Sequence, residues 1–420
     1  MPETLAQVAP QPTAESQEKI GSSPPPAAPK PPEKSKEEKD PFKSEREEFA
    51  DKITKLFGEK KFYVDQDEFR TQLADEKRRY LAIVGKRIEE PGQLPAERFF
   101  KAPLPQRDLA RQEKVDLSFR RQALAHAFLD TFTDFPVSAL IEFNNNPDSG
   151  PTYAIMATYE AGAGVGFLKD PEDIKKLGEK HAQLAAGSIR ELSHHEKEVK
   201  PDLAEVLEKR NAYQDYAGFL RSVTDILDKP VNGAGEFYSE DQQPLHEILE
   251  RRTGIPGFRE KALQLVQQLQ PVIEGAQQGI HLVHGDLAPN NLFLGDGTKS
   301  PELMALDFEY MGISENEVLA AVYDFGNLRA RAWNNEAFRT ALDRGMIDSY
   351  KNEGREEVGR AIVALGILRS HAGLAGFFEN YPVEKSSQPD QTERREATEK
   401  DIEQAWEIAR EIKMRQGMTG

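Results

Sequence analysis

The chain contains 420 residues, carries a net charge of −17 at pH 7 and has no cysteine. This length predicts two or three structural units rather than one. The negative charge argues against a nucleic-acid partner, and without cysteine there is no disulfide, thiolate chemistry or cysteine-bound metal. No apolar run is long enough to span a membrane, and no signal-peptide core stands at the amino terminus. We therefore expect a cytoplasmic protein without a membrane partner.

Residues 1–45 are of low complexity. Ten of the 27 prolines precede Phe42, and lysine and glutamate fill most of residues 33–48. Such a segment buries too little apolar surface to offset the entropy that is lost on ordering. We predict a disordered tail here, with a Pro-rich peptide that docks on another protein as the alternative.

Residues 46–159 contain short apolar runs and one long helical pattern. Phe49, Ile53 and Phe57 have helical spacing, and an apolar stripe predicts a helix over Leu109–Phe132. An Asn-rich loop at residues 144–150 predicts a hairpin between its flanking strands. The expected strands are residues 80–84, 98–101, 137–143 and 153–159.

Residues 160–383 have mostly helical patterns, and residues 384–420 read as a polar linker followed by a charged helix. Gly162, Gly164 and Gly166 lack the spacing of a dinucleotide-binding loop, so we expect a flexible turn. His194 and His195 are neighbours on a helix and point apart, which favours surface residues over a metal pair. The expected helices are residues 170–193, 201–227, 258–275, 336–350, 356–378 and 392–414.

One stretch late in the chain carries its most specific pattern. An apolar run leads into His284-Gly285-Asp286, and Asn291 follows five positions after Asp286. A second apolar run then leads into Asp307-Phe308-Glu309. We predict a strand-loop-strand hairpin that presents two carboxylates and one carboxamide. The alternative is an Asp- and Asn-rich turn between two buried strands.

Phosphoryl transfer uses this set of groups. One carboxylate orients the attacking hydroxyl and accepts its proton, while a second carboxylate and a neutral oxygen hold Mg²⁺ on the phosphates. The order H-x-D-x-x-x-x-N followed by D-F-x is that of a kinase catalytic loop and metal loop. With glycine after the histidine and D-F-E at the metal loop, the pattern resembles the aminoglycoside phosphotransferase and choline kinase family of small-molecule kinases.

This resemblance implies an α+β, protein-kinase-like fold with two lobes. A small β-rich N-terminal lobe (residues 46–159) would bind the nucleotide. A larger, mostly helical C-terminal lobe (residues 160–383) would carry catalysis and bind the acceptor. The implied cofactors are ATP and Mg²⁺, with GTP left open as the donor. Asp286 would be the catalytic carboxylate, Asn291 and Asp307 the metal ligands, and His284 a buried brace of the loop.

The resemblance also implies nucleotide-binding residues in the N-terminal lobe. Lys101 lies on a predicted strand and would pair with the phosphates. Its partner would be an acidic residue on the following helix, where Glu113 is the only glutamate. Backbone groups at the connection between the lobes would meet the adenine edge, and these belong to Ala157, Thr158 and Tyr159.

Asp324-Phe325-Gly326 also spells a kinase metal motif. It lies 38 positions after Asp286 and opens a predicted helix instead of following a buried strand, so we do not assign it to the metal. In the family that the chain resembles, an aspartate at this place braces the catalytic loop through hydrogen bonds. Asp324 matches that aspartate.

The pattern departs from that of protein kinases. No G-x-G-x-x-G precedes Lys101, and Gly285 stands where protein kinases have an arginine after the catalytic histidine. A small hydroxylated acceptor is therefore favoured over a protein acceptor. A catalytically silent binding or regulatory relative is the other alternative, although the retained Asp286, Asn291 and Asp307 argue against it.

The sequence leaves the acceptor and the oligomeric state open. Acidic and aromatic residues such as Glu309, Tyr310 and Trp333 suit a cationic amino alcohol or an aminoglycoside. A sugar is equally compatible with the pattern.

Overall fold

The fold is taken from a computed structural model of the chain. The structure describes residues 41–88, 96–146, 150–158, 171–195, 197–232, 242–294, 303–332, 335–379, 391–415 and 417. The chain divides into a unit of residues 1–41 and a unit of residues 42–420. Every element named below lies in the second unit, except that Pro41, the first residue of α1, is counted in the first unit.

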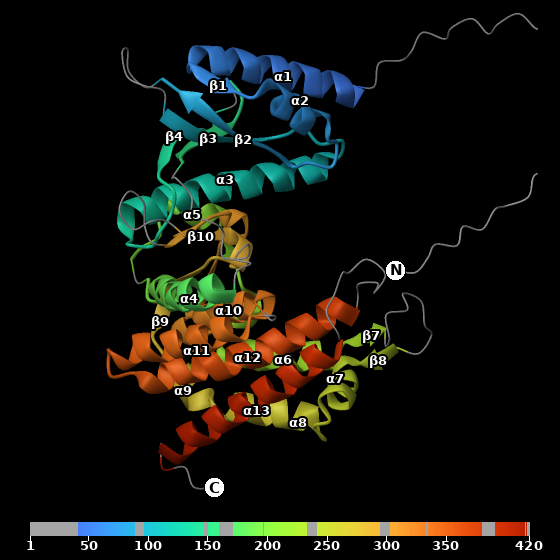
Figure 1. Cartoon of the computed structure of the whole chain (residues 1–420), viewed down its shortest axis with the longest axis vertical. Coiled ribbons are helices and arrows are strands. Elements are labelled where there is room, and N and C mark those ends of the chain that lie inside the picture. Colours follow the sequence, from blue (N-terminus) through green and yellow to red (C-terminus); the bar gives the residue numbers. More distant parts are fainter. Residues whose placement is uncertain are drawn as a thin grey trace, which may run out of the picture. The chain divides into compact units, whose positions relative to one another are not determined.

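In its described residues, the N-terminal part of this unit has one sheet and three helices. Figure 1 shows α1 and α3 on opposite sides of the sheet. Its elements are α1 (Pro41–Glu59), β1 (Phe62–Val64), α2 (Gln66–Ala74), β2 (Tyr80–Arg87), β3 (Ala96–Pro103), α3 (Leu109–Phe132), β4 (Leu140–Asn144) and β5 (Tyr153–Ala157). The five strands are antiparallel neighbours in the order β1-β2-β3-β5-β4. The predicted helix over Leu109–Phe132 is confirmed, whereas the strand expected at residues 137–143 starts only at Leu140.

The two faces of this sheet pack against different helices. Successive side chains of a strand point to opposite faces, so Phe100 and Lys101 lie on different sides. Phe100 packs with Phe57 of α1, whose ring centroid lies 4.8 Å away, in the core under α1 and α2. Tyr80 and Met156 belong to the core on the α3 side, which is the side of Lys101. The sheet therefore separates an outer apolar core from the face on which Lys101 lies.

The first helix begins earlier than the sequence predicts. Residues 41–45, predicted to belong to the disordered tail, form the first turn of α1. Phe42 and Arg46 are buried, and the Arg46 guanidinium donates to the backbone carbonyls of Leu73 and Asp75 at 2.8 Å each. These contacts come from residues about 30 positions away in the chain, so a local reading of composition misses them. Residues 1–40 lie outside the described residues.

The C-terminal part is mostly helical. Its elements are α4 (Pro171–Ser193), α5 (Pro201–Val206), β6 (Glu208–Lys209), the 3₁₀ helix η3 (Asn211–Tyr213), α6 (Tyr216–Leu227), β7 (Pro230–Asn232), β8 (Gln242–Pro244), α7 (Leu245–Thr253), α8 (Phe258–Gln268), α9 (Gln270–Glu274), β9 (Gln278–Val283), η5 (Pro289–Asn291), β10 (Leu292–Leu294), β11 (Leu303–Ala305), η6 (Phe308–Tyr310), β12 (Gly312–Asn316), α10 (Glu317–Arg331), α11 (Glu336–Lys351), α12 (Glu356–Glu379) and α13 (Gln391–Arg415).

Two predicted helices are interrupted. Residues 201–227 do not form one helix, because a short strand pairs with β12 at Glu208 and Lys209 between α5 and α6. Residues 258–275 split into α8 and α9, with Pro271 in the first turn of the second helix. Proline has no backbone N–H to continue a helix, which accounts for the second break.

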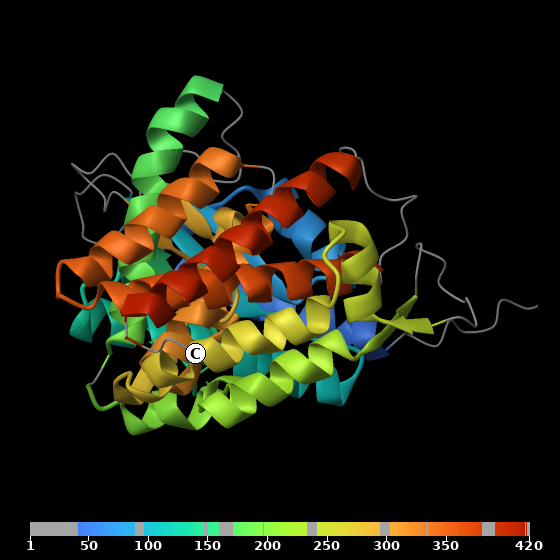
Figure 2. The ribbon, with the colours of Figure 1, turned by 90° about the horizontal axis from the view of Figure 1, so that it is seen from below.

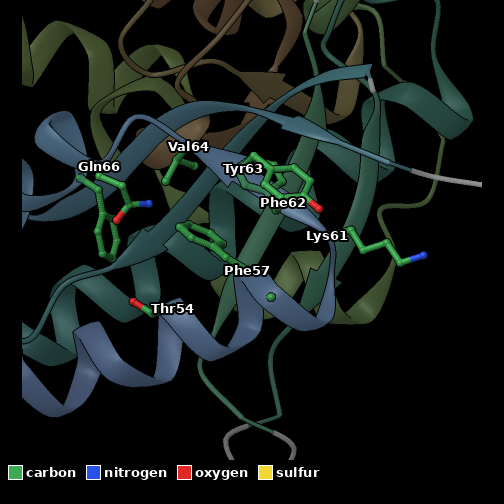
Figure 3. A pocket seen from close by; sticks show the side chains of 9 residues that line it. Thr54, Phe57, Lys61, Phe62, Tyr63, Val64 and Gln66 are labelled. Carbon is green, nitrogen blue, oxygen red and sulfur yellow. The ribbon is translucent and has the colours of Figure 1, made fainter. Parts of the chain in front are cut away.

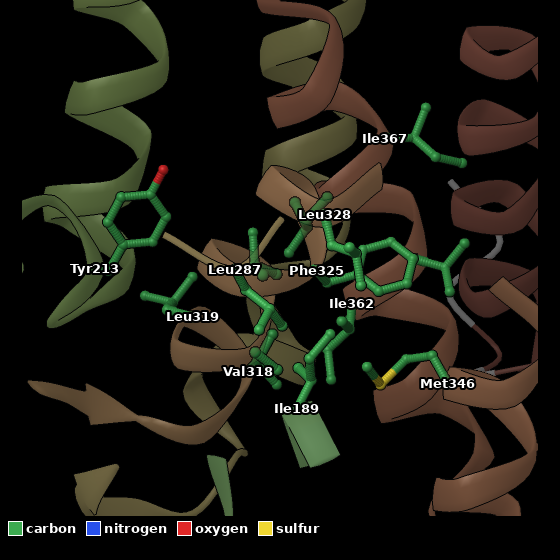
Figure 4. Close-up of a cluster of buried hydrophobic side chains, with 14 of the residues drawn as sticks. Ile189, Tyr213, Leu287, Val318, Leu319, Phe325, Leu328, Met346, Ile362 and Ile367 are labelled. Carbon is green, nitrogen blue, oxygen red and sulfur yellow. The ribbon is translucent and has the colours of Figure 1, made fainter. Parts of the chain in front are cut away.

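The helices of the C-terminal part share one large apolar core. Figure 4 shows Leu287 of the predicted catalytic loop among Val318, Phe325 and Leu328 of α10, with Ile362 of α12 beside them. All five side chains are buried. Helix α13 packs on α12 and α8, and Figure 2 shows it in red across them. The separate C-terminal segment at residues 384–420 and the lobe boundaries remain predictions.

The strands around the motif belong to two small sheets. β10 and β11 form a hairpin, with Leu292 opposite Ala305, so the prediction holds for the run before Asp307 but not for the run that enters the loop. The strand that enters the loop, β9, pairs instead with β12 in a sheet ordered β6-β12-β9. Ala305 also bridges to Val137, which ties the hairpin to the N-terminal part. The fold is thus α+β, with a β-rich N-terminal and a mostly helical C-terminal part, as the sequence predicts.

The two adjacent histidines are not surface residues. His194 contacts the fully buried Glu317, which also binds Arg355 through both carboxylate oxygens. His195 is buried and its ring lies 5.2 Å from that of Phe128. In the part of the chain that the structure describes, no three His, Asp or Glu side chains are arranged as ligands of one metal ion. No described helix combines the length and apolar character that crossing a membrane requires.

Candidate active site

The loop after β9 is organised around His284. This side chain is buried, its Nδ1 accepts the backbone N–H of Asp286 at 3.3 Å, and its Nε2 donates to the carbonyl of Leu306 at 3.0 Å. Burial lowers the pKa of His284 to about 4. One accepting and one donating ring nitrogen describe a neutral imidazole. These two hydrogen bonds join the loop to the segment before Asp307, and the role of His284 as a brace of the loop stays a prediction.

Asp324 holds the same loop from α10. Its Oδ2 accepts the N–H of His284 at 2.7 Å, and its Oδ1 accepts the N–H of Gly285 at 3.0 Å. Burial raises the pKa of Asp324 to about 6, although the two backbone donors act in the opposite direction. The sequence predicts Asp324 at the head of a helix, and this prediction is wrong. Helix α10 begins at Glu317, so Asp324 lies well inside it and caps the loop rather than its own helix.

Gly285 cannot be replaced by a larger residue without moving the loop. Its φ angle of +89° is one that glycine adopts readily. A Cβ atom at this position would lie 2.0 Å from the carbonyl oxygen of Tyr310 and 2.6 Å from Nη2 of Arg210. The arginine that protein kinases carry at this position would therefore not fit as long as the loop keeps this close approach to Tyr310.

Asp286 carries the half-buried carboxylate of the loop. Its Oδ2 faces the amide nitrogen of Asn291 at 3.4 Å, and its Oδ1 accepts from Nη2 of Arg331 at 2.6 Å. Burial raises the pKa of Asp286, and Arg331 opposes that rise. Arg331 lies outside the motif at residues 284–309, so the motif does not indicate this contact. Its spacing of seven positions from Asp324 on one helix face could have indicated a second contact with the loop.

Asn291 and Asp307 have the groups that a magnesium site needs. The amide nitrogen of Asn291 donates to the carbonyl of Asp286 at 2.9 Å, and its amide oxygen accepts from the side-chain amide of Asn290 at 3.2 Å. An amide oxygen has two lone pairs, so the second one is left for a cation. Asp307 has a left-handed backbone with φ +67°, an uncommon conformation outside glycine, and its side chain is 36% exposed. One carboxylate and one amide oxygen suit Mg²⁺, which keeps other positions for water and phosphate oxygens.

Lys101 extends from β3 toward the metal loop. Its Nζ lies 2.5 Å from Oε1 of Gln122 and 3.5 Å from Oδ1 of Asp307, and it stands 4.4 Å from the centre of the Tyr80 ring. Burial lowers the pKa of Lys101, against the attraction of Asp307. The predicted partner Glu113 is wrong. It is exposed on α3, and Gln122, nine residues further along the same helix, takes its place.

Glu309 connects the metal loop to the N-terminal sheet. It is only 2% exposed, and its carboxylate oxygens bind Nη2 of Arg79 at 2.7 Å and the hydroxyl of Tyr80 at 3.0 Å. Arg121 of α3 donates to the backbone carbonyl of Glu309 at 2.7 Å. The sequence suggests Glu309 as an acceptor-binding residue, and its buried position contradicts this. A buried carboxylate with these partners is not available to a cationic acceptor.

The predicted adenine-binding connection follows β5. The N–H of Ala157 donates to the carbonyl of Ala139 at 2.9 Å, and its carbonyl accepts from the Ser138 hydroxyl at 2.6 Å. The Thr158 hydroxyl donates to the carbonyl of Glu97 at 2.7 Å. Since the N–H of Ala157 already has a partner, the predicted contact with adenine is left to Thr158 and Tyr159. Tyr159 and Trp333 lie outside the described residues.

The link between β1 and β2 is not a tight glycine turn. It contains α2, which Asp65 caps by accepting the backbone N–H groups of Asp67 and Glu68 at 2.9 Å. A pocket of about 250 Å³ lies beside this link, between α1 and β1 (Figure 3). Its aromatic lining residues Phe57, Phe62 and Phe69 belong to the outer core, on the face of the sheet opposite Lys101. This pocket is therefore separate from the candidate active site.

No protein-family model and no curated protein sequence matches the chain. Among solved structures, the chain is similar to Plasmodium vivax ethanolamine kinase, with 14% identity, 80% of each chain covered and a TM-score of 0.38. It is similar to the GDP complex of wild-type aminoglycoside 2'-phosphotransferase-IIIa, with 14% identity, 80% and 90% coverage and a TM-score of 0.43. It is also similar to choline kinase LicA from Streptococcus pneumoniae, with 10% identity, 77% and 89% coverage and a TM-score of 0.37.

These three proteins are small-molecule kinases by name, the group that the motif at residues 284–309 resembles. Identities of 14% or less with TM-scores below 0.5 do not determine an activity or an acceptor. Both depend on the side chains at the site, and those are the ones described above.

Proposed function

We propose that this chain is an ATP- and magnesium-dependent phosphotransferase that moves the γ-phosphoryl group to a hydroxyl of a small molecule. One observation carries the proposal. The carboxylate of Asp286 lies against Asn291, and the carboxylate of Asp307 lies 3.5 Å from the buried Lys101. A hydroxyl-orienting carboxylate, two oxygen ligands for Mg²⁺ and a cation for phosphate are the groups that phosphoryl transfer needs.

Each residue has a role in this proposal. The acceptor oxygen attacks the γ-phosphorus, the bond to the ADP oxygen breaks, and the hydroxyl proton passes to Asp286. Lys101 binds the nucleotide phosphates, while Asn291 and Asp307 hold Mg²⁺, which neutralises phosphate charge when bound. His284 and Asp324 keep the loop in shape, and most of the acceleration comes from positioning and charge neutralisation.

The acceptor classes in this proposal are amino alcohols, sugars and aminoglycosides. A protein acceptor is less favoured because Gly285 has no room for the arginine that protein kinases carry there. A catalytically silent nucleotide-binding protein is the second candidate. Two features support it, the neutral Gln122 as partner of Lys101 and the absence of a tight glycine turn between β1 and β2 in the described link.

The test is ADP release from Mg-ATP in the presence of a panel of sugars, amino alcohols and aminoglycosides. We expect release that needs both Mg²⁺ and one class of acceptor, and that Asp307→Ala removes. Binding of Mg-ATP without release for any acceptor would favour the silent protein. Failure to bind Mg-ATP at all would rule out both candidates.

A further inference from the structure

Arg331 of α10 contacts the predicted catalytic loop and has N–H groups that the chain does not use. Its Nη2 donates to Oδ1 of Asp286 at 2.6 Å, and its side chain is 51% exposed. With the residues that the structure describes, Arg331 forms no other hydrogen bond or ion pair. A guanidinium has five N–H donors in a planar fork, so four of them remain for a ligand. A cation with free donors therefore stands beside the carboxylate that would orient the acceptor hydroxyl.

The backbone that carries Arg331 is fixed relative to the loop. Asp324, Asn327 and Arg331 are spaced i, i+3 and i+7, so they lie in one row along α10. In this row Asp324 accepts from the N–H of His284 at 2.7 Å, and Asn327 donates to the carbonyl of Gly285 at 3.5 Å. The helix therefore holds Arg331 at the loop, where a bound acceptor would meet it.

Two described acidic side chains next to the metal loop already have cations of the chain as partners. The buried Glu309 accepts from Nη2 of Arg79 at 2.7 Å. Glu208, on the strand that pairs with β12, binds Nη1 of Arg121 at 2.8 Å and Nη1 of Arg210 at 3.1 Å. An ammonium group would have to displace a cation of the chain from either carboxylate. Neither side chain is therefore a ready site for a cationic acceptor.

We propose that the acceptor is a hydroxylated compound with an anionic group, a carboxylate or a phosphate, and that Arg331 binds this group. The proposal rests on the proposed function, since it assigns Asp286 to the acceptor hydroxyl. Among the acceptor classes named above it selects sugars, in the form of sugar acids or sugar phosphates, over amino alcohols and aminoglycosides. The anionic group stays unchanged in the reaction. The hydroxyl oxygen forms the bond to the γ-phosphorus, the bond to the ADP oxygen breaks, and the hydroxyl proton passes to Asp286.

The contact between Arg331 and Asp286 sets how the two groups of the acceptor are spaced. The guanidinium and the carboxylate are neighbours, so the hydroxyl and the anionic group of the acceptor should be only a few bonds apart. Guanidinium binds carboxylate and phosphate through two parallel hydrogen bonds, and it repels an ammonium group. The ordinary reason for an arginine in the last turn of a helix is the helix dipole, and that role does not depend on the acceptor. Matched acceptors separate the two roles.

The experiment compares acceptors that share a skeleton and differ in charge. ADP release from Mg-ATP by the full chain is measured with glycerate, glycerol phosphate, glycerol and aminopropanediol, and with gluconate, sorbitol phosphate, sorbitol and glucamine. We expect kcat/KM for an anionic member to exceed that of its neutral counterpart by about 10- to 100-fold, with the cationic member lowest. Arg331→Met should remove this anionic-to-neutral ratio, and Arg331→Lys should keep most of it. Arg344→Met, which changes an exposed arginine of α11, is the matched control and should leave the ratio unchanged.

The ratio is the decisive quantity, because a loss of Arg331 that disturbs Asp286 slows all acceptors alike and cancels in it. Calorimetric titration of the same compounds in the presence of Mg-ADP gives a second readout that needs no turnover. Anionic members that bind to wild type and more weakly to Arg331→Met, in a chain that releases no ADP, would uphold the anion site and refute the proposed function instead.

Three results would overturn the proposal: highest kcat/KM for a cationic or neutral member, an anionic-to-neutral ratio that Arg331→Met leaves unchanged, or no binding of any anionic member by the wild-type chain. Preference for the phosphates over the carboxylates would uphold it and identify the anionic group as a phosphate.

Discussion

The two sides of the candidate site are held in different ways. On the acceptor side, α10 contacts the backbone of His284 and Gly285 and the side chain of Asp286. On the nucleotide side, Lys101 has a neutral amide and a carboxylate 3.5 Å away, and Asp307 is about one-third exposed. The acceptor side is therefore formed by the chain itself. On the other side, the cation of Lys101 and the carboxylate of Asp307 form one long ion pair, and the proposed function would have phosphate and Mg²⁺ bind these two groups.

The largest expected effect is the loss of turnover when Asp286, the proposed proton acceptor, is replaced. Asp286→Asn keeps the size of the side chain and removes the proton acceptor, so turnover should fall by about 10² or more. Nucleotide affinity should change little, because Asp286 lies on the acceptor side. ADP release and Mg-ATP binding measure the two quantities. Asp225→Asn, at an exposed carboxylate of α6, is the control, and wild-type turnover by Asp286→Asn would refute the assignment.

A second prediction concerns stability without ligands. Asp324→Ala leaves two buried backbone N–H groups without their acceptor, and should lower the free energy of unfolding by about 1–3 kcal/mol. Asp307→Ala should change it by less than about 0.5 kcal/mol and should abolish magnesium-dependent nucleotide binding. Chemical denaturation and ATP titrations measure both variants. If Asp324→Ala lost metal binding and Asp307→Ala kept it, the roles of the two aspartates would be reversed.

A third prediction uses pH. Burial raises the pKa of Asp324 from 3.8 to about 6. Between these values the folded chain holds a proton that the unfolded chain has released, so this group makes stability fall as pH rises through that window. Asp324→Asn should remove that part of the fall. Thermal melts across the window test it, and an identical pH dependence in wild type and Asp324→Asn would contradict the raised pKa.

Glu317 lies on the same helix, and its effect on the pH dependence of stability has the opposite sign to that of Asp324. It therefore serves as a comparison. Burial alone would raise its pKa, but His194 and Arg355 lower it from 4.5 to about 2. Its contribution to stability is complete above pH 4.5 and is lost as pH falls toward 2. Glu317→Gln should therefore reduce the loss of stability in acid, where Asp324→Asn has no such effect.

A fourth prediction concerns Lys101 and the proposed nucleotide side of the site. Gln122→Ala removes the amide that positions Lys101 and should weaken Mg-ATP binding by about tenfold. Glu113→Gln should leave the affinity unchanged, because Glu113 is exposed on another part of α3. Calorimetric titration of both variants decides which residue supports the lysine. A loss of affinity in Glu113→Gln alone would restore the partner that the sequence suggested.

The smallest effect is expected from residues 1–40. A chain that begins at Pro41 should melt and turn over like the full chain. A chain that begins at Phe49 should melt at a lower temperature, because it lacks the buried Phe42 and Arg46. Equal melting temperatures for both shortened chains would show that the first turn of α1 contributes nothing. A lower one for the chain from Pro41 would show that the tail docks on the body.

The sequence predicts what is local and misses what depends on distant residues. The loop residues Asp286 and Asn291, and the metal-loop Asp307, stand at spacings that their chemistry requires, so one chain is enough to find them. Lys101 is recognisable by its strand and position. The partner of Lys101 is not recognisable in the same way. Which turn of α3 faces Lys101 depends on how the helix packs, and in the structure this turn carries Gln122 and not Glu113.

Contacts between residues that lie far apart in the chain are harder to predict from the sequence. Arg79 meets Glu309 across 230 positions of the chain, and Arg331 meets Asp286 across 45. Helix ends also depend on distant contacts, as at the first turn of α1. Pro271, by contrast, was readable as an interruption of the helix predicted over residues 258–275.

The contacts that hold Glu309 bear on how the activity of the protein could be controlled. Many proteins with a loop of this kind use it as a switch, which leaves the site in one state and returns in another. Here Arg79 and Tyr80 of the sheet, and Arg121 of α3, hold Glu309 by its side chain and its backbone. An outward movement of this loop would break the three contacts of Glu309 and leave its buried carboxylate without partners. These three contacts hold the segment after Asp307 against the sheet and α3, so on the proposed function we expect on–off control to act on another part of the chain.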